Sequence, residues 1–206
     1  MGSKGTRSPL ESALRALTRA TRDRPDPTEL WKTLIDLASP KTADATVALV
    51  LGAAVEQALE IAISTHFVLD RDGCARMFED EEIAPIPTFA AKIRLAYALG
   101  IYEKHIRDEL NLLKGIRNAF AHAKADTKFT DKHIAQACGF LWLPQRWHPM
   151  GPPSGQQAIR DLDTPREKFV TSAQFLFMYL EHSDNGEKPK SFSKSGSYSP
   201  LAHPGT

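Results

Sequence analysis

The sequence predicts an all-α protein built as one bundle of seven or eight helices. Three helix-start signals of the same kind support this: Ser8-Pro9-Leu10-Glu11, Asp26-Pro27-Thr28-Glu29 and Thr164-Pro165-Arg166-Glu167. Each places a capping side chain before proline and a glutamate three positions after the cap, which is the pattern of a capping box. No segment alternates apolar and polar residues with period two for long enough to predict a strand.

Apolar residues that recur at helical spacing predict where the helices lie. The expected helices cover about residues 9–21, 27–38, 44–69, 88–99, 102–122, 131–141 and 165–180. Gly100 suits the left-handed residue after helix 88–99, and Asp131 can cap the helix that follows it. Helix 44–69 is apolar nearly all round, which predicts burial on several sides. We expect it to pack antiparallel to helix 102–122, whose inner stripe is Ile106, Leu110, Leu113, Ile116 and Phe120.

Composition divides the chain into three parts. Residues 1–43 are expected to form an N-terminal helical extension, residues 44–182 the helical domain, and residues 183–206 a disordered tail rich in Ser, Lys, Gly and Pro. Within the domain, residues 144–155 contain four prolines and two glycines, so we expect an extended loop there.

Charge balance and cysteine content exclude several classes of protein. Lys and Arg total 26 against 25 Asp and Glu, so the surface as a whole is not a polyanion-binding field. Two distant cysteines, Cys74 and Cys138, exclude a disulfide-rich scaffold and a four-cysteine zinc site. The polar start lacks the apolar segment of a signal peptide, and the most apolar stretch, 47–69, contains glutamates that suit no lipid-facing span. We expect a soluble, cytoplasmic protein without a membrane segment.

A polar cluster at the end of helix 102–122 is the candidate functional site. Arg117, Asn118 and His122 lie within six residues of one another. Asn118 and His122 share a helix face, whereas Arg117 is offset from His122 by about 140° and must bend its side chain to meet it. Such a trio suits a phosphodiester, because the guanidinium can clamp phosphate oxygens, the imidazole can transfer protons and the amide can orient either.

Local charge favours an anionic ligand for this cluster. Residues 104–133 contain seven Lys or Arg and four Asp or Glu, a local excess of +3 in a chain of net charge +1. Lys114 and Lys124 lie close to the cluster, and they are the candidate phosphate- or RNA-binding residues. The histidines have no ligand-like spacing with one another or with the cysteines, so we expect no metal site and no cofactor.

Three blocks of the sequence resemble known families. Arg117-Asn-Ala-Phe-Ala-His122 is similar to the R-x4-6-H signature of the HEPN superfamily (higher eukaryotes and prokaryotes nucleotide-binding domain). The segments 50–60, 89–100 and 110–122 together resemble the mannitol operon repressor (MltR-like) family. This similarity covers about residues 44–142.

The resemblance implies two alternative functions. HEPN proteins are helical bundles that commonly dimerise, and many are metal-independent ribonucleases. It therefore implies an RNA-cleaving toxin or defence protein, with Arg117, Asn118 and His122 as catalytic residues at a homodimer interface and an antitoxin as partner. The MltR-like branch implies a transcriptional regulator or co-repressor that acts through protein partners without catalysis. The sequence has no helix-turn-helix for reading DNA. The intact trio and the local positive charge favour the ribonuclease.

Glu56 has two interpretations that the sequence leaves open. With Glu60 it forms a polar stripe on the apolar helix 44–69. That stripe is either a solvent-facing edge or, through the alignment that the resemblance implies, a contact by which Glu56 orients Arg117. Lys92 is expected to be a surface charge.

Overall fold

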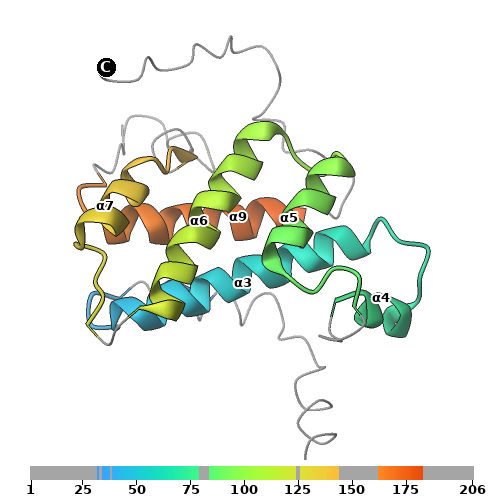
Figure 1. Ribbon diagram of the computed structural model, residues 1–206, viewed down its shortest axis with the longest axis horizontal. Helices are drawn as coiled ribbons and strands as arrows, with labels where there is room; N and C mark the ends of the chain where they lie inside the picture. The colour runs from blue at the N-terminus through green and yellow to red at the C-terminus, as the bar shows by residue number, and fades with distance from the viewer. Residues whose placement is uncertain are drawn as a thin grey trace, which may run out of the picture. The chain divides into compact units, whose positions relative to one another are not determined.

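The structure, a computed structural model, describes residues 32, 34–37, 39–78, 84–123, 126–143 and 162–182. These residues form helices and turns, and no strand occurs among them, which confirms the all-α prediction. The helices are α3 (Asp44–Ser64), α4 (Arg71–Phe78), α5 (Phe89–Ala98), α6 (Lys104–His122), α7 (Lys132–Gly139) and α9 (Pro165–His182), as Figure 1 shows. The chain divides into two units, Met1–Asp36 and Leu37–Thr206, and these helices all belong to the second.

Several expectations fall outside the described residues. These are the helix at 9–21, most of the helix at 27–38, the loop at 144–155 and the tail at 183–206. Residues 34–37 are helical, in the range expected for the second helix. The predicted boundaries of the extension, the domain and the tail stay predictions.

α3 is the central helix of the bundle. It packs against α5, α6 and α9, and Figure 1 shows α5 and α6 crossing one side of it while α9 runs alongside in the same direction. Its large buried side chains recur at every fourth position: Val47, Leu51, Val55, Leu59 and Ile63. α6 crosses α3 obliquely and runs the opposite way, so the C-terminal half of α6 lies over the first half of α3 (Figure 1).

The apolar character of α3 comes from its place in the core. By length and composition it is the one helix in the described part of the chain that is long and apolar enough to cross a membrane. However, 56% of its most apolar window is buried inside the bundle. Burial by three neighbouring helices explains the apolar sequence without a membrane.

A partly buried polar junction joins the starts of α3 and α9. Arg166 forms an ion pair with Asp44, and its two terminal nitrogens donate to the backbone carbonyls of Thr42 at 2.8 Å and Ser39 at 2.7 Å. The other Asp44 oxygen accepts from the backbone N–H of Phe129 at 3.0 Å, in the segment between α6 and α7. This junction fixes the end of the bundle at which α6 terminates.

α3 ends five residues earlier than the sequence predicts. Hydroxyl groups at its end bind helical carbonyls: Ser64 Oγ donates to Glu60 O, and Thr65 Oγ1 donates to Ala62 O, both at 2.8 Å. The Ala62 carbonyl, which the next turn of helix would use, is thereby bound to side chains, since His66 Nδ1 also lies 3.0 Å from it. α4 then follows as a helix that the sequence analysis missed. Its start signal is Asp70, whose side chain accepts from the backbone N–H of Gly73 at 2.8 Å.

The other helix ends largely follow the sequence signals. The capping box at Thr164 and Glu167 is confirmed by reciprocal hydrogen bonds of 3.0 and 3.2 Å, and Gly100 has the expected positive φ of 72°. Asp131 precedes α7 as expected, but its side chain accepts from the backbone N–H of Lys128 instead of capping α7. The inner stripe of α6 is confirmed, since all five of its residues are buried.

Candidate functional site

Arg117 lies where α6 crosses α3. Its side chain runs across Gly52 of α3: a Cβ atom on that glycine would stand 2.6 Å from Arg117 Cγ and 3.0 Å from Arg117 Cβ. Such a contact is closer than van der Waals packing permits, so only glycine at position 52 keeps this arrangement. The sequence analysis missed Gly52, because a glycine inside a helix carries no signal of what approaches it.

The guanidinium of Arg117 has one hydrogen bond in the described part of the chain. Its Nη1 donates to the side-chain oxygen of Asn118 at 3.1 Å. Its Nε is buried and has no hydrogen-bond partner there. The structure therefore brings Arg117 and Asn118 together, at the boundary between α6 and α3.

His122 is not brought to the same point. It is the last residue of α6, it is exposed, and it makes no hydrogen bond or ion pair with the residues that the structure describes. Arg117 bends toward α3 instead of around α6 toward His122. Arg117 and Asn118 can hold an anion, but among the described residues no hydrogen bond joins the His122 imidazole to either of them.

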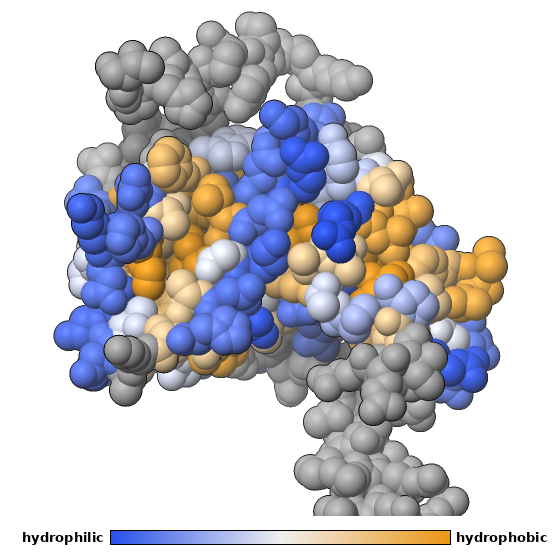
Figure 2. Space-filling view, in the orientation of Figure 1, coloured by the Kyte–Doolittle hydropathy of each residue, from blue (hydrophilic) through white to orange (hydrophobic). Residues whose placement is uncertain are grey.

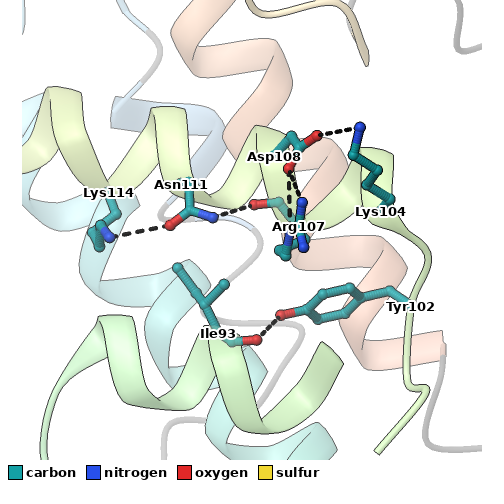
Figure 3. Close-up of polar contacts among 7 residues, drawn as sticks. All are labelled: Ile93, Tyr102, Lys104, Arg107, Asp108, Asn111 and Lys114. Carbon is teal, nitrogen blue, oxygen red and sulfur yellow. Dashed lines mark hydrogen bonds and ion pairs between the residues drawn. The ribbon is translucent and has the colours of Figure 1, made fainter. Parts of the chain in front are cut away.

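Lys114 lies one turn before Arg117 on the same helix. Its Nζ donates to Asn111 Oδ1 at 3.1 Å, and Asn111 in turn donates to the backbone carbonyl of Arg107 at 2.9 Å, as Figure 3 shows. Lys124, the other candidate phosphate ligand, lies outside the described residues. In Figure 2 a hydrophilic band follows α6 across this face, bordered by hydrophobic surface on both sides.

Glu56 pairs with Lys92. The Lys92 ammonium lies 3.1 Å from a Glu56 oxygen and 3.0 Å from a Glu60 oxygen, and 5.7 Å from the centre of the Phe78 ring. Lys92 is only 6% exposed, so the expectation of a surface charge is wrong: two carboxylates compensate for its burial. Neither interpretation of Glu56 matches these bonds, because its side chain pairs with Lys92 of α5, and no hydrogen bond or ion pair joins it to Arg117 in the described chain.

Glu109 is a buried carboxylate that the sequence analysis did not single out. It is fully buried on α6, and it accepts hydrogen bonds from Ser172 Oγ of α9 at 2.7 Å and from the backbone N–H of Trp142 at 3.2 Å. Burial raises its pKa to about 7, although these hydrogen bonds act in the opposite direction. Its position on the inner face, one residue before Leu110, is the signal that sequence reasoning could have used.

His105 lies on the same side of α6 as Glu109. Its ring packs edge-on against Trp142, with 5.1 Å between ring centres. Burial lowers the pKa of His105, against the opposing effect of the nearby Glu103 carboxylate. The search of the described residues finds no group of three or more His, Cys, Asp or Glu side chains that could hold a metal ion.

The fold and this geometry define an all-α helical bundle with a cationic crossing point, and comparison with known proteins adds one relation. No family model matches the chain, and no curated protein matches it. Among solved structures, the fold is similar to that of a chain in the X-ray structure of the MtlR–HPr complex from Escherichia coli. The TM-score is 0.55 with 17% sequence identity, over 74% of this chain and 99% of that chain. The likeness supports an MtlR-like fold.

Proposed function

We propose that this protein is a non-catalytic regulator that acts by binding a protein partner. The observation that carries the proposal is the similarity of its fold to the MtlR–HPr complex, in which the similar protein is bound to another protein. HPr is therefore the first partner to test. The MltR-like resemblance adds that such a complex would regulate transcription.

The geometry of the polar cluster supports binding over RNA cleavage. The predicted cleavage by Arg117 and His122 needs the imidazole within hydrogen-bond reach of the phosphate that the arginine holds. Here the Arg117 side chain is committed to Gly52 and Asn118, while His122 stands exposed at the helix end. A homodimer that brings in the His122 of a second copy is the arrangement that the ribonuclease alternative requires. Homodimerisation stays a prediction, which light scattering tests directly.

A calorimetric titration tests the proposed function. The full chain is titrated with Escherichia coli HPr, and we expect saturable binding with a dissociation constant in the micromolar range or tighter, about −8 kcal/mol at 1 μM. A parallel assay incubates the chain with single-stranded RNA in EDTA, and we expect no cleavage. Absence of HPr binding, together with RNA cleavage that His122→Ala abolishes, would replace the proposal with the ribonuclease.

A further inference from the structure

We infer that the C-terminal half of α6 binds an acidic helix of a protein partner, with Lys114 and Arg117 each taking a carboxylate. These two residues are named the α6 cation pair. The inference rests on the proposed function, because it assigns the surface by which a partner docks and the chemistry that the partner presents.

The two halves of α6 differ in how their charges are neutralised. In the N-terminal half, Asp108 lies 2.9 Å from Arg107 and 4.0 Å from Lys104 (Figure 3). The Arg107 guanidinium also lies over the Tyr97 ring, 4.6 Å from its centre. From residue 110 to residue 123 the chain contains no Asp or Glu. Among the residues that the structure describes, the printed side-chain partners of the α6 cation pair are the amides of Asn111 and Asn118.

Arg117 stands apart from the other partly buried arginines of the described chain. Arg166 bonds to one carboxylate and two backbone carbonyls, and Arg107 bonds to a carboxylate. Within the described part of the chain, one of the five N–H donors of Arg117 binds a neutral amide, and its Nε is buried without a partner. A partly buried cation without a carboxylate partner costs free energy, and a carboxylate from a binding partner would supply the counterion.

Gly52 makes the arginine a preorganised receptor. The absence of a Cβ on Gly52 lets the aliphatic part of the Arg117 side chain lie across α3, which restricts the positions open to the partly buried guanidinium. Lys114 and Arg117 are three residues apart, so their Cβ atoms lie about 5–6 Å from each other on one face. Carboxylates three or four residues apart on a partner helix have the same spacing, so the two helix faces match in charge and in pitch.

The observations favour an acidic protein over RNA. Two cations are few for a polyanion, whose affinity grows with the number of phosphates neutralised. Recognition of single-stranded RNA also uses aromatic rings on which bases stack. The aromatic residue of this half of α6 is Phe120, and its ring is buried against Phe129, with 4.8 Å between ring centres.

Fluorescence anisotropy with the full chain tests this surface. The probe is a labelled helical peptide with glutamates four residues apart on one face, and the control probe has glutamines instead. We expect the acidic peptide to bind, the glutamine peptide to bind at least about tenfold more weakly, and binding to weaken with added salt. Arg117→Gln should weaken binding by about tenfold or more, whereas Arg76→Gln, which changes an exposed arginine on α4, should leave it unchanged.

Two further variants separate position from charge. Gly52→Ala keeps every charge but displaces the Arg117 side chain, so it should weaken binding of the acidic peptide as Arg117→Gln does. Arg117→Lys keeps the positive charge but lacks the planar set of guanidinium donors, so the loss of affinity should be intermediate. Thermal melting of each variant checks that it is folded. If Gly52→Ala does not fold, Arg117→Gln and Arg117→Lys still decide the matter.

The outcomes distinguish this inference from the proposed function. Equal binding of both peptides, or an Arg117→Gln chain that binds like the wild type, overturns the inference even if HPr binds. Single-stranded RNA that binds in an Arg117-dependent way, with no binding of the acidic peptide, reassigns the surface to nucleic acid. Conversely, if the acidic peptide binds in an Arg117-dependent way and HPr does not bind, the inferred docking surface is supported and HPr is rejected as the partner.

Discussion

Replacing Glu109 with glutamine should stabilise the protein at neutral and alkaline pH. The carboxylate is fully buried between α6, α9 and Trp142, and its pKa is raised to about 7, chiefly by desolvation. Glutamine has nearly the same shape: its oxygen can accept from the Trp142 N–H, and its amide can donate to Ser172 Oγ, which reverses the direction of the present hydrogen bond. The substitution therefore removes the buried charge without opening a cavity.

The size of the effect follows from linkage between protonation and folding. A pKa of about 7 in the folded chain against 4.5 in the unfolded chain corresponds to about 3 kcal/mol, at 1.36 kcal/mol per unit. Between pH 4.5 and about pH 7, the folded chain keeps the Glu109 proton that the unfolded chain has released. The contribution of Glu109 to stability is therefore fully present below pH 4.5 and is lost as the pH rises through about 7.

Chemical denaturation at pH 5 and pH 8 measures this contribution. From pH 5 to pH 8 the wild type should lose about 2–3 kcal/mol of unfolding free energy relative to Glu109→Gln. Comparing the two proteins cancels the opposing titration of His105, whose lowered pKa favours folding as the pH rises. Asp126→Asn, which neutralises an exposed carboxylate, is the matched control and should show no such difference. A Glu109→Gln protein that is less stable than the wild type at both pH values would refute the reasoning.

Three further substitutions test the packing around the candidate site. Phe120→Ala removes a buried ring from the inner stripe of α6 and should lower the free energy of unfolding by about 3–5 kcal/mol in a denaturation experiment. A decrease below about 1 kcal/mol would contradict its place in the core. Lys92→Ala removes the ammonium that pairs with Glu56 and Glu60, and it should cost about 3 kcal/mol. An unchanged melting temperature would show that these two ion pairs contribute nothing. His122→Ala should change stability by less than about 0.5 kcal/mol and leave HPr binding intact, since the ring is exposed, and a loss of HPr binding would place His122 in the partner interface.

The positions of most helices are predictable from the sequence because their signals are local. The capping box at Thr164 and the apolar stripe of α6 each depend on residues within a few positions of one another, and the structure confirms both. The end of α3 is less predictable, since apolar residues continue to Leu69 while the hydroxyl groups of Ser64 and Thr65 already close the helix.

The candidate site is predictable only in part, because its geometry depends on contacts between helices. The sequence places Arg117 and Asn118 side by side, but it cannot show that Gly52 of α3 receives the arginine stem. For the same reason, the sequence cannot show that Lys92 forms an ion pair with Glu56, since these residues are 36 positions apart. Charge and spacing identify candidate side chains, and tertiary packing decides which of them meet.

The junction between Asp44 and Arg166 has a consequence for protein synthesis. The two residues are 122 positions apart, so a ribosome that makes about 5–20 residues per second completes α3 several seconds before α9 emerges. During that interval the most apolar helix of the chain lacks the neighbour that runs along its length, and its Asp44 carboxylate lacks a counterion. The nascent chain thus passes through a stage with exposed apolar surface, on which a chaperone can act before the last helix completes the fold.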